Sequence, residues 1–492
     1  MKQFFFTITA ISFLLLSSCT PKEVVITGQL KGDTGELAFS NPNEGTYFLG
    51  FRDTLDVAED GSFELKFNLK QPSFISLRIP SAGTDCKLLV EPGGSYHIII
   101  DSENGTEISG TNEEGQRLYA TLPNPSFISM QNRELQKENS LAVIHEKMEE
   151  MKSNDLKGFQ TLLDEDKISS SFFQLIQKDR DCYYASLESV ILQIKMFKVD
   201  RNENGEYLLD NGDNLLKAQE KIYTQYPPDD NSLLISSFWE EYAKNFIQNY
   251  KQFSKKDFTI ESFKEMYTKG TFNTFIIDEA KKNLSGKALE FFQASYIYGV
   301  SFQNRFEKEL IAMYGQFEKD YPQSMYSKYL TPEIDKVVEF YEKIEGEFSE
   351  NTSFVENYEQ INTLEEAVKS FRGKKVYIDV WATWCGPCKE EFKHSEALKE
   401  ILKDKDIQML YISIDEDRND SQWKDLIKYY NLEGSHIRAN EVFRKELMVR
   451  YDENAKEPYI AIPWYILIDE EGNVLQKKAK KPSQIVSGED IF

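Results

Sequence analysis

Hydrophobic and polar residues alternate along the chain from about residue 23 to residue 110. Between residues 63 and 69 every second residue is Phe or Leu, and the residues between them are polar. The alternation recurs at residues 75–79 and ends at Pro80. Side chains of a strand point alternately to opposite faces, so this pattern predicts half-buried strands. A small antiparallel sandwich or barrel fits the region, and we predict an antiparallel β-sandwich domain at residues 19–112.

From about residue 113 to residue 345 the hydrophobic positions recur every three or four residues, which is the period of a helix. No polar or metal-binding group accompanies the aromatic residues in these stripes, so we interpret them as helix-packing core rather than as a cofactor site. The prediction is an all-α domain of unassigned chemistry at residues 113–345. Two such stripes are Ile235, Phe238, Trp239, Tyr242 and Phe246, and Phe306, Leu310, Met313, Phe317 and Tyr321, the latter ending at Pro322.

Strands alternate with helices in the last part of the pattern, for which we predict an α/β domain at residues 346–492. Buried strands are expected at 375–380, 407–414 and 464–468, with a turn at 470–473 before a short strand at 474–475. The segment after Cys388 has the period of a helix. The whole chain is therefore expected to be multidomain.

Length and composition agree with this division. A chain of 492 residues is too long for one hydrophobic core, because single cores stop growing at about 250 to 300 residues. A hydrophobic fraction of 40% supports packed interiors. The formal charge of -24 would repel phosphate backbones and anionic lipid surfaces, which argues against a nucleic-acid partner. The simplest interpretation is an acidic surface that keeps the protein in solution.

The first residues have the order of a secretion signal. Lys2 is followed by an apolar run and by small residues before Cys19. The segment 16–19 (Leu-Ser-Ser-Cys) resembles the bacterial lipobox, whose cysteine is acylated and becomes the mature N-terminus. We predict a lipoprotein signal peptide at 1–18, lipidation of Cys19 and a cell-envelope location, facing the periplasm or at the outer membrane. A plain secretory signal or an uncleaved anchor is the alternative.

Four cysteines remain in the mature chain, and export places them where disulfides persist. Cys86 and Cys182 lie far apart in the sequence, and ordinary burial is the favoured interpretation while their pairing stays open. Cys385 and Cys388 form a Cys-x-x-Cys motif where a predicted strand leads into a helix.

The start of that helix favours ionised sulfur. Unpaired N–H groups and a partial positive charge at a helix N-terminus stabilise a thiolate relative to a thiol. Pro387 suits the first helical turn, and Gly386 permits close approach of a partner chain. We predict that Cys385 is the exposed nucleophile and that Cys388 resolves the mixed disulfide formed on it.

Cys388 must lose its proton before it can attack. Asp379 lies between apolar residues in the predicted strand, where burial raises the pKa of a carboxyl group and a buried acid needs a partner or a task. We predict that Asp379 accepts this proton. The alternative is an edge-strand aspartate that points to solvent.

Residues 377–389 (YIDVWATWCGPCK) closely resemble the active-site segment of thioredoxins, and residues 461–469 (AIPWYILID) resemble their second conserved loop. The resemblance implies a thioredoxin fold, a cis bond before Pro463 that places it against the disulfide, and a client-binding surface of Trp384, Gly386, Pro387, Ile462 and Pro463. The C-terminal part is similar to the TlpA/ResA branch of envelope thiol-disulfide oxidoreductases. The strand-rich region before it is similar to a domain often found ahead of that module in lipoproteins.

Two positions depart from the thioredoxin pattern. Lys393 stands where a proline usually kinks the active-site helix, so this helix is expected to run straighter. Tyr411 stands where thioredoxin has a lysine that pairs with the buried acid. Neither departure removes the redox pair.

The sequence therefore predicts an envelope thiol-disulfide oxidoreductase without a cofactor other than its redox-active disulfide. A zinc site is not expected, because it needs four ligands and only one Cys-x-x-Cys unit exists. The Gly-Pro pair resembles reducing thioredoxins, near about −270 mV, rather than oxidising periplasmic enzymes near about −120 mV. Protein thiols or disulfides are then the substrates, and a membrane electron donor is required. The alternatives are a lipid-anchored binding or scaffold protein with a regulatory redox module, and a specialised reductase of cytochrome c maturation.

Overall fold

The structure is a computed structural model of the chain. It describes residues 20–491 apart from the segments 32–35, 43–44, 80–83, 102–104, 126–127, 199–208, 256–258, 453 and 455–456. The predicted signal peptide and its lipidation site, Cys19, lie outside the described residues.

The chain forms two compact units. The first comprises Met1–Tyr296 and Phe317–Tyr329, and the second comprises Ile297–Gln316 and Leu330–Phe492. The strand-rich region and most of the helical region thus share one unit, while part of the helical region belongs with the C-terminal α/β part. The domain limits expected at residues 112 and 345 stay predictions.

The first unit begins with two four-stranded sheets, in the orders β4-β1-β7-β8 and β3-β2-β5-β6. Most neighbours are antiparallel, but β1 and β7 run parallel, so the expectation of purely antiparallel strands was wrong. A parallel pair needs a crossover between its strands, and the whole second sheet supplies it. The strands are β1 (Lys22–Lys31), β2 (Glu36–Ser40), β3 (Arg52–Asp56), β4 (Ser62–Leu69), β5 (Ser73–Ile79), β6 (Thr84–Val90), β7 (Ser95–Asp101) and β8 (Gly105–Gly110).

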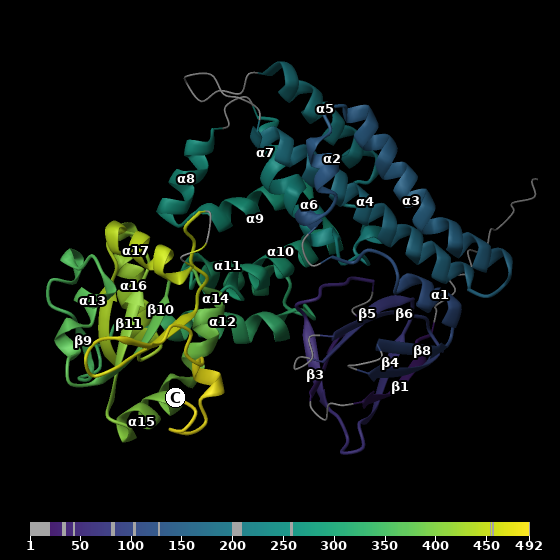
Figure 1. Cartoon of the computed structure of the whole chain (residues 1–492). Helices are drawn as coiled ribbons and strands as arrows, with labels where there is room; N and C mark the ends of the chain where they lie inside the picture. The colour runs from purple at the N-terminus through teal and green to yellow at the C-terminus, as the bar shows by residue number, and fades with distance from the viewer. Residues whose placement is uncertain are drawn as a thin grey trace, which may run out of the picture. The chain divides into compact units, whose positions relative to one another are not determined.

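Strands β5 and β6 are buried on both faces. One hydrophobic cluster contains side chains of both sheets, such as Ile26 and Leu77. A second cluster joins Phe74 and Leu89, on the other face of β5 and β6, to Phe172 of a helix. In Figure 1 the helices of this unit accordingly lie on the side of β5 and β6.

Helices make up the middle of the chain, as the periodicity predicts. Two expected starts were wrong: Phe306 precedes its helix in a left-handed conformation (φ 54°), and Ile235 and Phe238 precede theirs. Helices α10, α11 and α12 have residues in both units. The helices are α1 (Glu113–Tyr119), α2 (Arg133–Lys137), α3 (Leu141–Asp164), α4 (Ser170–Lys198), α5 (Leu209–Gln225), α6 (Trp239–Asn245), α7 (Lys251–Phe253), α8 (Ile260–Lys269), α9 (Phe272–Asn283), α10 (Gly286–Ser301), α11 (Glu309–Asp320) and α12 (Ser327–Ile344).

A buried charge cluster joins the second sheet to helix α4. Asp179 on α4 is fully buried, and its carboxylate lies 3.6 Å from the Lys87 ammonium of β6 and 2.6 Å from the Arg180 guanidinium. The hydroxyls of Tyr119 and Ser236 each donate a hydrogen bond of 2.8 Å to it. Every charge in the cluster therefore has an opposite charge beside it, as buried ions require.

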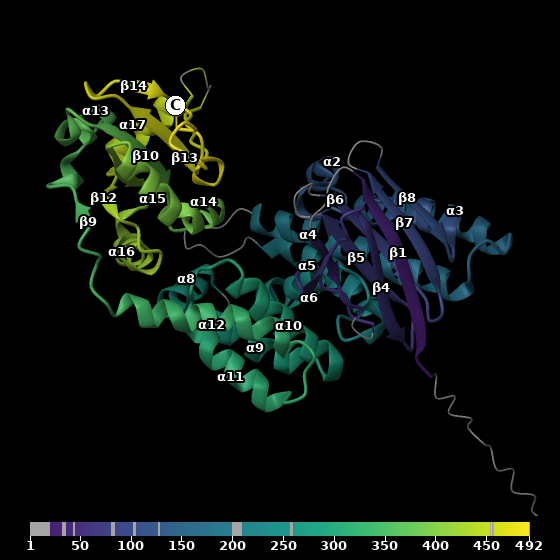
Figure 2. The same cartoon turned by 90° about the horizontal axis from the view of Figure 1, so that it is seen from below.

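The second unit is built on a six-stranded sheet in the order β14-β13-β10-β11-β12-β9. Strands β10, β11, β12 and β9 are parallel, and β13 and β14 are antiparallel to their neighbours. Figures 1 and 2 show these strands and the surrounding helices in green and yellow. The elements are β9 (Thr352–Phe354), α13 (Leu364–Ala367), β10 (Lys375–Trp381), α14 (Gly386–Glu391), α15 (Ser395–Asp404), β11 (Ile407–Ser413), α16 (Asp420–Tyr429), β12 (Gly434–Arg438), α17 (Glu441–Tyr451), β13 (Trp464–Ile468) and β14 (Val474–Gln476).

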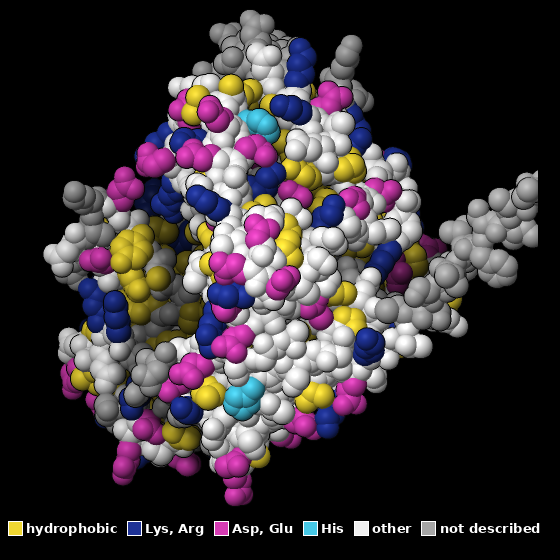
Figure 3. Space-filling view, turned by 90° about the vertical axis from the view of Figure 1, so that its right-hand side faces the viewer, with side chains coloured by type: hydrophobic (Ala, Val, Ile, Leu, Met, Phe, Trp, Pro, Cys, Tyr) yellow, Lys and Arg dark blue, Asp and Glu magenta, His cyan; other side chains and the backbone are white. Residues whose placement is uncertain are grey.

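The surface mixes charges of both signs. On the face shown in Figure 3, acidic and basic side chains lie interspersed, and hydrophobic side chains lie between them both singly and in groups. Among the described helices, none combines the length and the apolar character that crossing a membrane requires.

Candidate active site

Cys385 and Cys388 form a disulfide at the start of helix α14, with their Cα atoms 5.3 Å apart. Cys385 is the residue that caps the helix, and its sulfur accepts a hydrogen bond of 3.2 Å from the Cys388 backbone N–H. Pro387 lies in the first turn, where a missing N–H is tolerated. This is the placement that the sequence predicts, and it aims the positive end of α14 at the sulfur of Cys385.

The disulfide is less accessible than expected. Cys385 is only 4% exposed and Cys388 is fully buried, so the expectation of an exposed nucleophile was wrong for this oxidised state. The bond ties the Cys385 sulfur to a buried partner at the base of the turn. Trp384 is 61% exposed, and the space around Gly386 is open. The residues next to Cys385 are therefore more accessible than its sulfur.

Asp379 lies on β10 and is 1% exposed. Burial raises its pKa well above the ordinary value, and the nearby carboxylate of Glu391 adds to the rise. One of its carboxyl oxygens has no hydrogen-bond partner. Its neighbours across the sheet are Tyr411 on β11 and Tyr465 on β13, so no cation compensates it there. The solvent-facing alternative is thereby excluded, and the raised pKa suits this carboxyl group to taking up and releasing a proton.

Glu391 is a second acid of the site, and it was not expected. It lies three residues after Cys388, on the same side of α14, and is 8% exposed. Its carboxylate accepts hydrogen bonds from the backbone N–H (2.9 Å) and hydroxyl (3.1 Å) of Ser483 and from Lys481 (3.0 Å). Burial alone would raise its pKa, but these contacts hold the pKa below the ordinary value. A negative Glu391 therefore helps to keep Asp379 protonated.

A fully buried aspartate fixes the loop before the disulfide. Asp415, which follows β11, accepts hydrogen bonds from the Thr383 backbone N–H (2.8 Å) and the Thr383 hydroxyl (2.7 Å). The Ser413 hydroxyl donates to it as well, at 2.8 Å. Thr383 stands two residues before Cys385, so Asp415 holds one flank of the redox turn. Asp415 was not among the predicted site residues, and its only signal in the sequence is an Asp-rich stretch directly after a predicted strand.

The second predicted loop ends beside the same edge of the sheet. The bond between Ile462 and Pro463 is cis, as the resemblance implied. Strand β13 begins directly after it, and Trp464 pairs with Val380 at the carboxyl end of β10. The loop and the redox turn therefore leave the sheet at neighbouring positions.

The active-site helix does not run straight, which corrects the expectation drawn from Lys393. A 3₁₀ turn at Phe392–His394 separates α14 from α15. Phe392 packs edge-on against Trp381 at 5.1 Å and contacts Tyr430 at 5.2 Å. Tertiary packing here interrupts the helix without a proline.

A protein-family model matches the part of the chain that contains these residues. The family model Redoxin matches residues 354–489, which include the disulfide, Asp379 and the cis-proline loop. We call residues 354–489 the Redoxin domain after this match. The strand-rich and helical regions before it lie outside the match.

Curated relatives of the Redoxin domain are thiol-disulfide proteins. The chain is 30% identical over 114 residues to the thiol-disulfide oxidoreductase ResA of Bacillus thuringiensis subsp. konkukian, which covers 22% of this chain and 57% of ResA. It is 30% identical over 79 residues to the thiol:disulfide interchange protein DsbD of Actinobacillus pleuropneumoniae, which covers 16% of this chain and 13% of DsbD. The chain thus spans little more than half the length of the ResA relatives.

Solved structures include similar proteins. A thiol:disulfide interchange protein from Bacteroides sp. is 23% identical, covering 23% of this chain and 70% of that protein, with a TM-score of 0.21. StoA from Bacillus subtilis is 22% identical, covering 23% of this chain and 80% of StoA, with a TM-score of 0.19. The assignment of the Redoxin domain rests on the sequence matches.

The other candidate groups lie outside the Redoxin domain. Cys86 and Cys182 are buried free thiols in the first unit, and burial raises the pKa of Cys86 to about 12, which keeps it protonated. No cluster of three or more His, Cys, Asp or Glu side chains suited to a metal ion occurs in the part of the chain that the structure describes.

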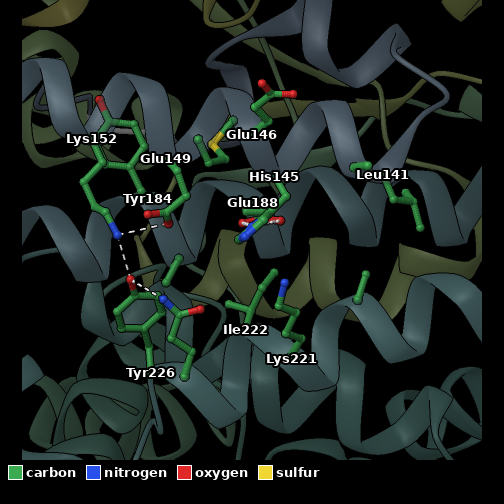
Figure 4. A pocket seen from close by; sticks show the side chains of 15 residues that line it. Leu141, His145, Glu146, Glu149, Lys152, Tyr184, Glu188, Lys221, Ile222 and Tyr226 are labelled. Atoms are coloured by element: carbon green, nitrogen blue, oxygen red, sulfur yellow. Dashed lines mark hydrogen bonds and ion pairs between the residues drawn. The ribbon is translucent and has the colours of Figure 1, made fainter.

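A pocket of about 310 Å³ lies among α3, α4 and α5 (Figure 4). Several of its polar groups pair with one another. His145 lies 3.2 Å from the Glu188 carboxylate, and the Lys152 ammonium donates to Glu149 (3.0 Å) and to the Tyr226 hydroxyl (2.7 Å). These side chains therefore have hydrogen-bond partners without a ligand. The Redoxin domain stays the candidate active site.

Proposed function

We propose that this protein is a cell-envelope thiol-disulfide oxidoreductase that reduces protein disulfides through Cys385 and Cys388. The observation that carries the proposal is the cysteine pair at the start of α14, with a buried acid, Asp379, that has no cationic partner on the neighbouring strands. A helix N-terminus stabilises the thiolate of one cysteine, and a nearby proton acceptor can deprotonate the other. Such a dithiol can exchange with a disulfide.

The reaction begins from the reduced pair. The Cys385 thiolate attacks one sulfur of a client disulfide, a mixed disulfide forms, and one client thiolate leaves. Cys388 gives its proton to the ionised form of Asp379 and attacks the Cys385 sulfur, so the disulfide closes and the second client sulfur leaves as a thiolate. Asp379 then releases the proton, and each of the two client thiolates takes up one proton. The client gains two electrons and two protons, and the protein loses them. A dithiol donor at the membrane must return them for the next cycle.

Client proteins would meet the surface around the turn. Trp384 is exposed, and Gly386 leaves open space beside the disulfide. Ile462 and Pro463 precede β13 at the same edge of the sheet, where an extended client segment could pair with exposed backbone. We assign Trp384, Gly386, Pro387, Ile462 and Pro463 to client binding on this basis.

A location in the cell envelope is part of the proposal. The lipobox-like segment before Cys19 supports a lipid anchor in the envelope, facing the periplasm or at the outer membrane. The two four-stranded sheets with a shared hydrophobic cluster support a β-sandwich as the fold of the strand-rich region. The reducing direction rests on the Gly-Pro pair of the motif.

An insulin-reduction assay with dithiothreitol as electron source tests the activity. The wild-type protein should accelerate insulin reduction, and Cys385→Ala should return the rate to that of dithiothreitol alone. Cys388→Ala should trap clients as mixed disulfides on Cys385, because the resolving thiol is missing. An equal rate for wild type and Cys385→Ala would refute the proposal.

A further inference from the structure

The two flanks of the redox turn are held by different parts of the second unit. Asp415 holds Thr383, two residues before Cys385. On the other side, the Lys389 ammonium donates a hydrogen bond of 2.8 Å to the backbone carbonyl of Asn304. Lys389 directly follows Cys388, whereas Asn304 lies in the connection between α10 and α11, 85 residues earlier. The acceptor of the second contact thus belongs to the helical region, outside the Redoxin domain.

Lys389 is committed to this contact. It is 1% exposed although a lysine side chain is normally solvated, and burial lowers its pKa to about 8, with a further lowering by Arg305. A buried ammonium needs hydrogen bonds to replace its water. Lys393, one helical turn later, shows the ordinary alternative, because it is 65% exposed and pairs with Glu390.

The connection that offers the carbonyl has a fixed shape. Asn304 and Phe306 both have left-handed backbone angles, φ 50° and 54°. For an aromatic residue this conformation persists only where the surroundings enforce it. The Phe306 ring stacks on Phe340 at 4.4 Å and contacts Tyr429 at 4.7 Å, and its carbonyl accepts a hydrogen bond of 2.8 Å from Tyr341. The Asn304 carbonyl is therefore held in place from the second unit itself.

We propose that the contact between Asn304 and Lys389 is a positioning clamp that favours the closed disulfide, so that the α10–α11 connection sets how readily Cys385 and Cys388 are reduced. This inference rests on the proposed function, since it concerns the same redox pair. Lys389 and Asn304 are positioning residues, because they act on the redox pair through the backbone of the turn.

The direction follows from where the clamp is made. It is present with the disulfide closed. Reduction frees the two sulfurs to separate, and the turn between them relaxes. Contacts that fix both flanks of the turn oppose this relaxation, so they stabilise the disulfide more than the dithiol. Weakening the clamp should shift the equilibrium toward the dithiol.

Substitutions at Asn304 test the clamp without removing a charge. The residue contributes its backbone carbonyl, so only its backbone angle matters. Glycine adopts a left-handed angle freely, whereas valine resists it strongly and alanine less so. The measurement is the equilibrium of the full-length protein with dithiothreitol, which breaks the protein disulfide, closes its own ring disulfide and passes two electrons and two protons to the protein.

We expect Asn304→Val to raise the equilibrium constant for reduction about fivefold, because a hydrogen bond to a charged group is lost mainly from the disulfide state. Asn304→Gly should stay within about twofold of wild type on the same grounds, with Asn304→Ala between them. If valine prevents folding, the alanine variant carries the measurement. A shift below about twofold for both valine and alanine overturns the proposal.

A double-mutant cycle separates the clamp from general loosening. In a Lys389→Met background the Asn304→Val shift should fall below about twofold, since the partner is gone. In a Lys393→Met background it should keep its full size. An unchanged shift in the Lys389→Met background contradicts the clamp. The equilibrium needs no protein client, so it can fail while insulin reduction succeeds, or succeed while insulin reduction fails.

Discussion

Two buried aspartates, one in each unit, differ in every neighbour. Asp179 on α4 lies beside Lys87 and Arg180 and accepts hydrogen bonds from two hydroxyls. Burial alone would raise its pKa, but the two cations hold it well below the ordinary value. Asp379 on β10 is equally buried, has no such cation, and its pKa is raised by burial and by Glu391.

The difference shows that burial by itself does not identify a functional acid. Asp179 is permanently charged at neutral pH and joins a sheet to a helix, so its contribution is to stability. Asp379 can change its protonation state without breaking an ion pair, which suits it to the proton transfer that we propose. The partners of the carboxyl group decide which of the two roles a buried aspartate has.

The largest expected effect comes from Asp179→Asn. It leaves Lys87 buried without its counter-charge and leaves Arg180 with only the more distant Asp155 (3.7 Å), which should lower the free energy of unfolding by about 3 to 5 kcal/mol. Asp181→Asn on the same helix is the control; its side chain is 25% exposed, and a loss below about 1 kcal/mol is expected. Urea unfolding measures both. Equal losses for the two variants would remove the structural role of Asp179.

Asp379→Asn should lower activity and not stability, the opposite of Asp179→Asn. Loss of the proton acceptor should slow insulin reduction by about 100-fold, at the lower end of general acid–base effects. The free energy of unfolding should not fall, and above about pH 4 it should exceed that of the wild type, because asparagine carries no ionisation penalty and no buried cation is left unpaired. Asp404→Asn, an exposed residue at the end of α15, is the matched control for both measurements. A normal rate in Asp379→Asn would assign the proton transfer to another group.

The elements that position Asp379 could be predicted, because the signal for them is local. Strand β13 has the expected bounds, and β10 and β11 differ from expectation by one residue. A continuous apolar run identifies such a strand without knowledge of its partners. The motif at Cys385 and the acid six residues before it are local in the same sense.

The partners of these residues could not be predicted. Glu391 meets Ser483 across 92 residues, Lys389 meets Asn304 across 85, and Lys87 meets Asp179 across 92. The pattern of one sequence predicts whether a position is buried, but not which residue packs against it. The parallel pairing of β1 with β7 was missed for the same reason.

The two aspartates should respond to pH with opposite signs. Asp379 has a raised folded pKa, so above about pH 4 the unfolded chain has lost a proton that the folded chain keeps, and stability falls with rising pH by up to about 1.4 kcal/mol per unit until the folded pKa is reached. Asp179 has a lowered folded pKa, so its stabilisation is present above about pH 4 and is lost as pH falls through the folded value.

Fluorescence can separate these contributions, since four of the five tryptophans lie in the second unit and Trp239 lies in the first. Urea unfolding of the oxidised wild type and of Asp379→Asn should therefore be compared between pH 4 and pH 8. The two should converge toward pH 4, because Asp379 is then protonated in the unfolded chain as well as in the folded one. A constant difference over this range would mean that the Asp379 pKa is not raised.

The smallest expected effect comes from giving Asp379 the kind of partner that Asp179 has. Tyr411 is its neighbour on β11, and the resemblance to thioredoxin, which has a lysine there, suggests this substitution. Tyr411→Lys should lower the Asp379 pKa and move the acid limb of the insulin-reduction pH profile down by about one unit, which corresponds to about 1.4 kcal/mol. Tyr411→Phe adds no charge and should leave the limb in place. In the lysine background Asp379→Asn should reduce stability, because it would then leave a buried cation unpaired, as Asp179→Asn does. If the limb stays in place with lysine at position 411, neighbouring charge does not separate the two aspartates.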